Sequence, residues 1–106
     1  MIADQLRETI VNRIRAACDP DRIILFGSHA RGEGGADSDI DLMVVKSGVE
    51  QRRREAVRIY RALKGLCLPI DVLVATPEII ERYKDRWCTV YHDVAREGTV
   101  IYDKLR

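Results

Sequence analysis

The chain is short and nearly neutral. It has 106 residues, of which 46% are hydrophobic and 33% charged, with a formal net charge of +1. This length fits a modest core, so we expect one globular domain over residues 1–106. The small net charge argues against a protein that binds polyanions over its whole surface. No apolar run is long enough for a membrane span or a signal sequence, and we therefore expect a cytoplasmic protein.

The cysteines do not form a recognisable pattern. Cys18, Cys67 and Cys88 are odd in number, lie far apart and include no Cys-x-x-Cys pair. This spacing argues against a disulfide framework and against a zinc site. We expect reduced thiols in the core.

The first third of the chain predicts a helix and two strands. Residues 3–17 carry apolar side chains at helical spacing, at Leu6, Ile10, Ile14 and Ala17, and the segment Asp19-Pro20-Asp21 ends this helix. The runs 22–26 and 40–45 are short, apolar and rich in isoleucine, leucine and valine. Such runs are typical of buried strands.

The remaining chain predicts alternating helices and strands. Residues 50–66 form a second amphipathic helix, with a buried stripe of Ala56, Ile59, Tyr60, Leu63 and Leu66, and residues 70–75 form a third strand. Thr76 and Pro77 start a helical region that Gly98 ends, as one helix or as two with Asp85 as a second cap. Residues 99–102 are a short final strand. The fold class is α/β (α+β), a small mixed sheet of three to four strands flanked by helices.

The segment between the first two strands carries the chemistry. Gly27-Ser28 is followed by ten residues, His29 to Ser38, and then by Asp39 and Asp41. Alternate residues of a strand share a face, so these two carboxylates lie side by side. Paired carboxylates that stay ionised typically hold a hard cation such as Mg²⁺ together with substrate phosphates. Gly27 permits a close backbone approach to a phosphate, and the Ser28 hydroxyl can donate a hydrogen bond to it.

Three other phosphate or metal motifs each lack a required residue, and the EF-hand loop lacks two, because Gly48 also stands at its glutamate position. Glu33 stands where a Walker loop needs lysine, and Leu42 stands where a calcium-binding EF-hand loop needs glycine. Asp37 occupies the last glycine position of a dinucleotide-binding fingerprint. These substitutions exclude the three readings.

The Gly-Ser, ten-residue, Asp-x-Asp pattern resembles the signature of the minimal nucleotidyltransferases of the DNA polymerase beta superfamily. The surrounding phrases GSxARG and SDIDL are similar to those of the family as well. The resemblance implies the family's small mixed-sheet fold and a third carboxylate on a neighbouring strand. Asp71, alone in the apolar run 70–75, is the residue that fits this role. Without the resemblance, an acid at a strand start is more often a half-exposed turn residue.

The resemblance also implies a reaction with ATP as the substrate and two Mg²⁺ ions as cofactors. Asp39 and Asp41 would hold the ion that binds the triphosphate, and with Asp71 they would hold a second ion at the attacking hydroxyl. Asp71 is also a candidate acceptor of the hydroxyl proton. Gly27 and Ser28 would bind the phosphates. Arg31 is either a further phosphate contact or a surface arginine that closes a short helix.

From the number of residues left outside the expected helices and strands, we expect the acceptor-binding region to come from a partner. Chains of this kind resemble the antitoxins of HEPN/MNT toxin–antitoxin pairs, which implies AMP transfer to a hydroxyl, most simply a tyrosine, of a HEPN-type toxin. Two alternatives stay open: a catalytically silent antitoxin that acts by binding, and an enzyme that modifies a small hydroxylated molecule. We expect neither a membrane nor a nucleic acid as a direct partner.

Three features have no place in this chemistry. Arg54, Arg58 and Arg61 lie on one face of the second helix, either as a solvated face or as a docking surface for an acidic partner or RNA. Trp87 is expected in the core or an interface. His29 and His92 are expected to be incidental.

Overall fold

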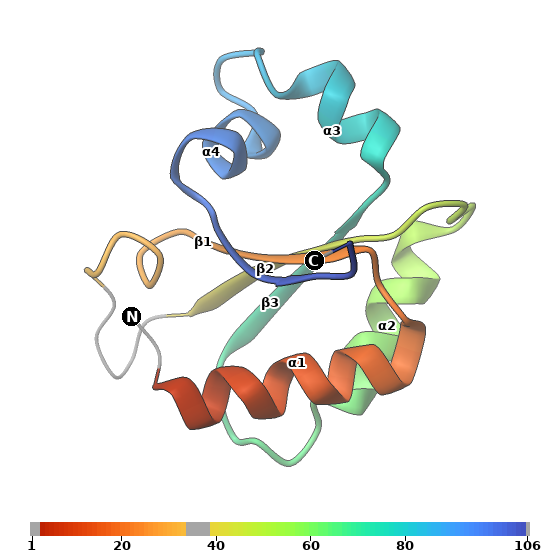
Figure 1. Ribbon diagram of the computed structural model, residues 1–106, viewed down its shortest axis with the longest axis vertical. Coiled ribbons are helices and arrows are strands. Elements are labelled where there is room, and N and C mark those ends of the chain that lie inside the picture. The colour runs from red at the N-terminus through yellow and green to blue at the C-terminus, as the bar shows by residue number, and fades with distance from the viewer. Residues whose placement is uncertain (1–2, 34–38, 106) are drawn as a thin grey trace.

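The structure is a computed structural model that describes residues 3–33 and 39–105. These residues form four helices and four strands (Figure 1). In chain order they are α1 (Asp4–Cys18), β1 (Arg22–Phe26), β2 (Ile40–Val45), α2 (Arg52–Ala62), β3 (Ile70–Ala75), α3 (Pro77–Tyr83), α4 (Val90–Glu97) and β4 (Thr99–Asp103). The end of the ten-residue spacer, residues 34–38, lies outside the described residues.

The strands form one mixed sheet in the order β3-β2-β1-β4. Strand β1 pairs antiparallel with both β2 and β4, whereas β2 and β3 are parallel. Helices α1 and α2 cover one face of the sheet, and α3 and α4 cover the other (Figure 1). The predicted α+β architecture is therefore confirmed.

Both faces of the sheet are packed. On the first face, Leu42 and Val44 contact a cluster that includes Ile10 and Ile14 of α1 and Ile59 of α2. On the second face, Met43 and Val45 pack with residues that include Val94 of α4. A strand that is buried on both faces becomes a continuous apolar run, which is why β2 was recognisable in the sequence. Asp41 is its only polar residue.

Helix α2 is shorter than the sequence predicts. It ends at Ala62, and the chain turns away through Gly65, whose φ is +96°. The predicted burial of Tyr60 is wrong, because this side chain is 42% exposed. Its hydroxyl reaches the edge of the sheet and accepts a 2.8 Å hydrogen bond from the N–H of Val72.

The helical region after β3 consists of two helices. Thr76 caps α3 as predicted, with its hydroxyl accepting from the N–H of Ile79 at 3.3 Å. The second cap is Thr89, whose hydroxyl accepts from the N–H of His92 at 3.1 Å, so the assignment of Asp85 to this role is wrong. Trp87 lies between the helices and is 76% exposed, which contradicts a place in the core.

The three thiols differ in environment. All are free, but only Cys18 is buried, whereas Cys67 and Cys88 are exposed. The expectation of three core thiols is correct for Cys18 alone. No helix in the described part of the chain combines the length and the apolar character needed to cross a membrane.

Candidate nucleotide-binding and metal site

The sheet brings the predicted residues to one of its ends. Asp41 near the start of β2 lies opposite Phe26, the last residue of β1, so Gly27 follows directly beside it. On the other side, Asp41 lies opposite Asp71 in the parallel β2–β3 pair. Side chains at paired positions of adjacent strands share a face of the sheet. The two carboxylates are therefore neighbours, although 30 positions separate them in the sequence.

Gly27 is required at its position by two constraints. Its φ is +76°, in the left-handed region that favours glycine. A Cβ atom at this position would also clash with Oδ2 of Asp41 and lie 3.2 Å from its Cγ. The backbone of the turn and the Asp41 carboxylate therefore lie close together.

The turn after Gly27 resembles one turn of a helix. The N–H of Arg31 donates to the carbonyl of Gly27 at 3.2 Å, and that of Glu33 donates to the carbonyl of Ser28 at 2.9 Å. Among the described residues, the N–H groups of Ser28 and Ala30 have no acceptor. Unpaired amides at the start of a helical turn are suited to bind an anion.

The carboxylates differ in environment. Asp41 is partly buried, whereas Asp39 and Asp71 are exposed. Burial raises the pKa of the Asp41 carboxyl, and the negative charges of Asp71 and then Asp39 raise it further. The three acids therefore repel one another in the structure as it stands.

The repulsion between the three carboxylates allows us to ask whether these residues fit a bound cation. Carboxylate oxygens are the ligands that Mg²⁺ prefers, and a bound cation would remove the unfavourable interaction between them. Within residues 3–33 and 39–105, however, no three acidic, histidine or cysteine side chains converge closely enough to enclose an ion. The three carboxylates are chemically suitable ligands for Mg²⁺, but their side chains would have to rotate towards each other to bind it.

The guanidinium of Arg31 is already bound to two carboxylates of the protein, so it is not free to bind a phosphate. Its guanidinium donates to Glu33 at 3.1 Å and to Glu97 at 3.2 Å, and these bonds raise its pKa. Glu97 is the last residue of α4, so the pair ties the turn to that helix. Arg31 would have to exchange at least one carboxylate for a phosphate to act as a clamp.

His29 is the residue whose place the sequence did not reveal. It is only 8% exposed, and in its charged form it lowers the pKa of Asp41. The prediction that His29 is incidental rests on its spacer position inside the signature, and it stays a prediction. The structure adds that this imidazole is buried and acts electrostatically on Asp41.

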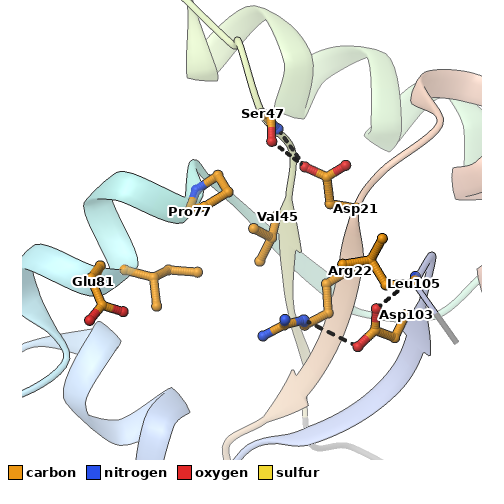
Figure 2. A pocket seen from close by; sticks show the side chains of 9 residues that line it. Asp21, Arg22, Val45, Ser47, Pro77, Glu81, Asp103 and Leu105 are labelled. Carbon is orange, nitrogen blue, oxygen red and sulfur yellow. Dashed lines mark hydrogen bonds and ion pairs between the residues drawn. The ribbon is translucent and has the colours of Figure 1, made fainter.

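A cavity of about 480 Å³ lies at the opposite end of the sheet (Figure 2). It is lined by residues at the start of β1 and the end of β2, among them Asp21, Arg22 and Val45, and by Ile80 of α3. Figure 2 shows Asp21 bonded to Ser47 and Arg22 paired with Asp103, so these charged groups have partners in the protein. The cavity is separate from the carboxylate site.

The comparison with known families identifies the class of protein to which this fold and site belong. The sequence profile of the nucleotidyltransferase domain family matches residues 5–100, and the chain belongs to that family. No curated protein matches the sequence significantly.

Solved structures share the fold at low sequence identity. A protein from Sulfolobus solfataricus that is assigned as a nucleotidyltransferase aligns with a TM-score of 0.68 and 20% identity, over 96% of this chain and 81% of that one. A chain of a toxin–antitoxin complex with AMP-PNP aligns with a TM-score of 0.61 and 20% identity, over 92% and 73%. A third match, with a TM-score of 0.56 and 19% identity over 97% and 75%, comes from a tri-AMPylated Shewanella oneidensis HEPN toxin in complex with its MNT antitoxin.

Proposed function

We propose that residues 1–106 act as one nucleotidyltransferase domain that transfers AMP from ATP to a tyrosine hydroxyl of a HEPN-type toxin in the cytoplasm. The observation that carries this proposal is the meeting of Asp41, Asp71 and the Gly27 turn at one end of the sheet. The resemblance to chains from complexes of a HEPN toxin with an MNT antitoxin supports the choice of partner.

One group of residues in the site binds the phosphates, and another acts on the attacking hydroxyl. The free amides of Ser28 and Ala30, with the Ser28 hydroxyl, bind the terminal phosphates. Asp71 is exposed and so can reach the incoming hydroxyl and accept its proton. The hydroxyl oxygen forms a bond to the α-phosphorus, the bond from that phosphorus to the bridging oxygen breaks, and pyrophosphate leaves. Asp39, Asp41 and Asp71 would hold two Mg²⁺ ions, which neutralise the phosphate charge when bound.

Two observations favour a second candidate, an antitoxin that neutralises its partner by binding alone. In the described residues the acids do not enclose an ion, and Arg31 is held by two carboxylates. Both features are compatible with a site that has lost its activity.

A mass measurement separates the two candidates. The chain is mixed with its partner, ATP and Mg²⁺, and the partner's mass is read before and after incubation. We expect the addition of one or more AMP groups by the wild type and none by Asp39→Ala. Full neutralisation of the toxin by Asp39→Ala, with no adduct from the wild type, would instead establish the binding module.

Calorimetry tests the metal site itself. Binding of ATP should require Mg²⁺ and should be lost in the Asp39→Ala plus Asp41→Ala variant, because unscreened carboxylates repel a triphosphate. The matched control is Asp85→Ala plus Asp93→Ala, which removes two exposed acids elsewhere. Equal binding by wild type and the Asp39/Asp41 variant would refute the assignment.

A further inference from the structure

The positive charge of the chain is concentrated on one helix. Residues 52–64 contain six basic residues and one acid, a net charge of +5, while the rest of the chain has 12 basic and 16 acidic residues, a net charge of −4. The near-neutral total therefore conceals a strongly basic surface on an otherwise acidic molecule. We call this surface the α2 basic face and define it by its basic residues, Arg52, Arg53, Arg54, Arg58, Arg61 and Lys64.

Most of these charges have no partner among residues 3–33 and 39–105. Arg58 pairs with Glu55 at 3.7 Å, and Arg52 donates to the Tyr91 hydroxyl at 3.1 Å. Arg53, Arg54 and Arg61 make no ion pair or side-chain hydrogen bond with any residue that the structure describes. Like charges three or four residues apart, as at Arg54, Arg58 and Arg61, destabilise a helix, and an external anion would relieve this repulsion.

A groove of about 620 Å³ runs between the first half of α2 and the outer strand β3. Arg52, Arg53 and Arg54 line one wall, and Val72, Leu73 and Val74 line the other. Leu73 is 43% exposed although it lies in the middle of its strand. Val72 and Val74 are themselves buried, so Leu73 supplies the exposed apolar surface of the groove, and its polar side carries three arginines and one acid, Glu50.

Strand β3 is also an edge that can accept another strand. The N–H of Val72 donates to the Tyr60 hydroxyl and therefore points away from β2. The carbonyls of Pro69 and Ala75 point the other way, because they accept hydrogen bonds from β2 and from the residue that follows β2. Backbone groups alternate in direction along a strand, so the N–H and C=O of Val74 face outward like those of Val72. Tyr60 covers the N–H of Val72, and the groups of Val74 stay open to a partner.

We infer that this groove binds an acidic, extended segment of a partner protein, which pairs with the β3 edge at Val74 and places its carboxylates against Arg53 and Arg54. Edge-to-edge pairing of two copies of the chain is disfavoured by charge, because it would bring two sets of arginines together. A nucleic acid lacks the alternating backbone donors and acceptors that the edge offers, and it would extend over a molecule that is negative elsewhere.

The position of the groove relates to the proposed chemistry. Asp71 directly precedes Val72, and although their side chains point to opposite faces of the sheet, a docked segment that continued along the edge past Val72 would reach the end of β3 at which Asp71 lies. The assignment of this segment as the carrier of the acceptor hydroxyl rests on the proposed function. Binding without nucleotide measures docking alone, so failure of docking and failure of AMP transfer are distinguishable.

The test uses fluorescence anisotropy with a labelled peptide of alternating glutamate and valine. We expect wild-type binding that weakens as NaCl rises from about 0.05 to about 0.5 M. Arg53→Glu plus Arg54→Glu should weaken it by about tenfold or more. The control, Arg82→Glu plus Arg96→Glu, makes the same charge change on α3 and α4 and should bind like the wild type.

Two further measurements address the strand edge. Val74→Pro should abolish peptide binding but leave the sheet intact, because the lost N–H points outward. If that variant does not fold, hydrogen exchange of the Val74 amide in the wild type provides the same information, and we expect it to slow when peptide binds. Unchanged exchange, no binding of the peptide, displacement of the peptide by oligouridylate, or dimerisation through this face would each overturn the inference.

Discussion

At the level of single residues, the close approach of Gly27 to Asp41 links the backbone conformation of the turn to the position of the carboxylate. Gly27→Ala should cost about 1 kcal/mol of stability, because alanine is strained at positive φ. It should also displace the Asp41 carboxylate and abolish Mg²⁺-dependent ATP binding. Thermal denaturation and calorimetry measure the two effects.

Gly48→Ala provides the matched control. Gly48 has a φ of +77°, but a Cβ there meets nothing within 4 Å. We expect the same loss of stability with unchanged ATP binding. Retention of ATP binding by Gly27→Ala would show that the carboxylate does not need its present position.

The pKa of Asp41 determines a pH dependence of stability. A raised pKa means that the folded protein binds more protons than the unfolded chain, so stability falls as pH rises from the ordinary value of 3.8 through the higher folded pKa. Above that pKa the whole destabilisation is present. Asp41→Asn should therefore raise the melting temperature at pH 7 without metal and have little effect at about pH 3.

Asp21 is the control of opposite sign. The hydroxyl of Ser47 donates to its carboxylate and lowers its pKa, so its stabilisation is present above pH 3.8 and is lost as pH falls through the lower folded pKa. Asp21→Asn should therefore destabilise the protein at pH 7. A lower melting temperature for Asp41→Asn would mean that Asp41 is structural.

At the scale of elements, α4 depends on its cap. The Thr89 hydroxyl accepts from His92 and also donates to the carbonyl of Arg86 at 2.8 Å. Thr89→Ala should cost about 1 kcal/mol, whereas Thr9→Ala, which removes one exposed bond to Gln5 in mid-helix, should cost less. Denaturant unfolding compares the two, and equal losses would argue against the capping role.

The strands were predictable and the helix ends were less so. All four strands match within one residue, because they are short apolar runs bounded by glycine, proline or charge. Helix α2 was overestimated because Leu63 and Leu66 continue its apolar spacing after the backbone has turned. The exposure of Tyr60 and Trp87 depends on how neighbouring elements are placed, which periodicity does not encode.

The candidate site was predictable in its residues and not in its contacts. The signature spacing identified Gly27, Ser28, Asp39 and Asp41, and these roles stay predictions. Strand order was needed to place Asp71 opposite Asp41. His29 acts on Asp41, and Arg31 pairs with Glu97. Both contacts join segments that are distant in the sequence, so no local pattern predicts them.

At the scale of the whole molecule, we expect the labelling rate of the Cys18 thiol to measure how often the folded chain opens. Cys18 is buried between α1 and the sheet, and burial raises the pKa of its thiol, so it should react with a thiol reagent only when the fold opens. The exposed Cys67 and Cys88 should react at once. ATP with Mg²⁺ at 100 times its dissociation constant should slow Cys18 labelling by about 100-fold. An unchanged rate would indicate that the nucleotide does not bind the folded chain.

Because β2 and β3 are parallel, the two sides of the site come together at a defined stage of folding. Parallel neighbours need a crossover, here made by α2, so Asp41 and Asp71 meet only after a loop of some 30 residues has closed. Their repulsion is therefore absent from any state in which β3 is undocked. If Asp71→Asn accelerates refolding, the β2–β3 ladder is already formed at the rate-limiting barrier. If it only slows unfolding, the two acids come together after that barrier has been crossed.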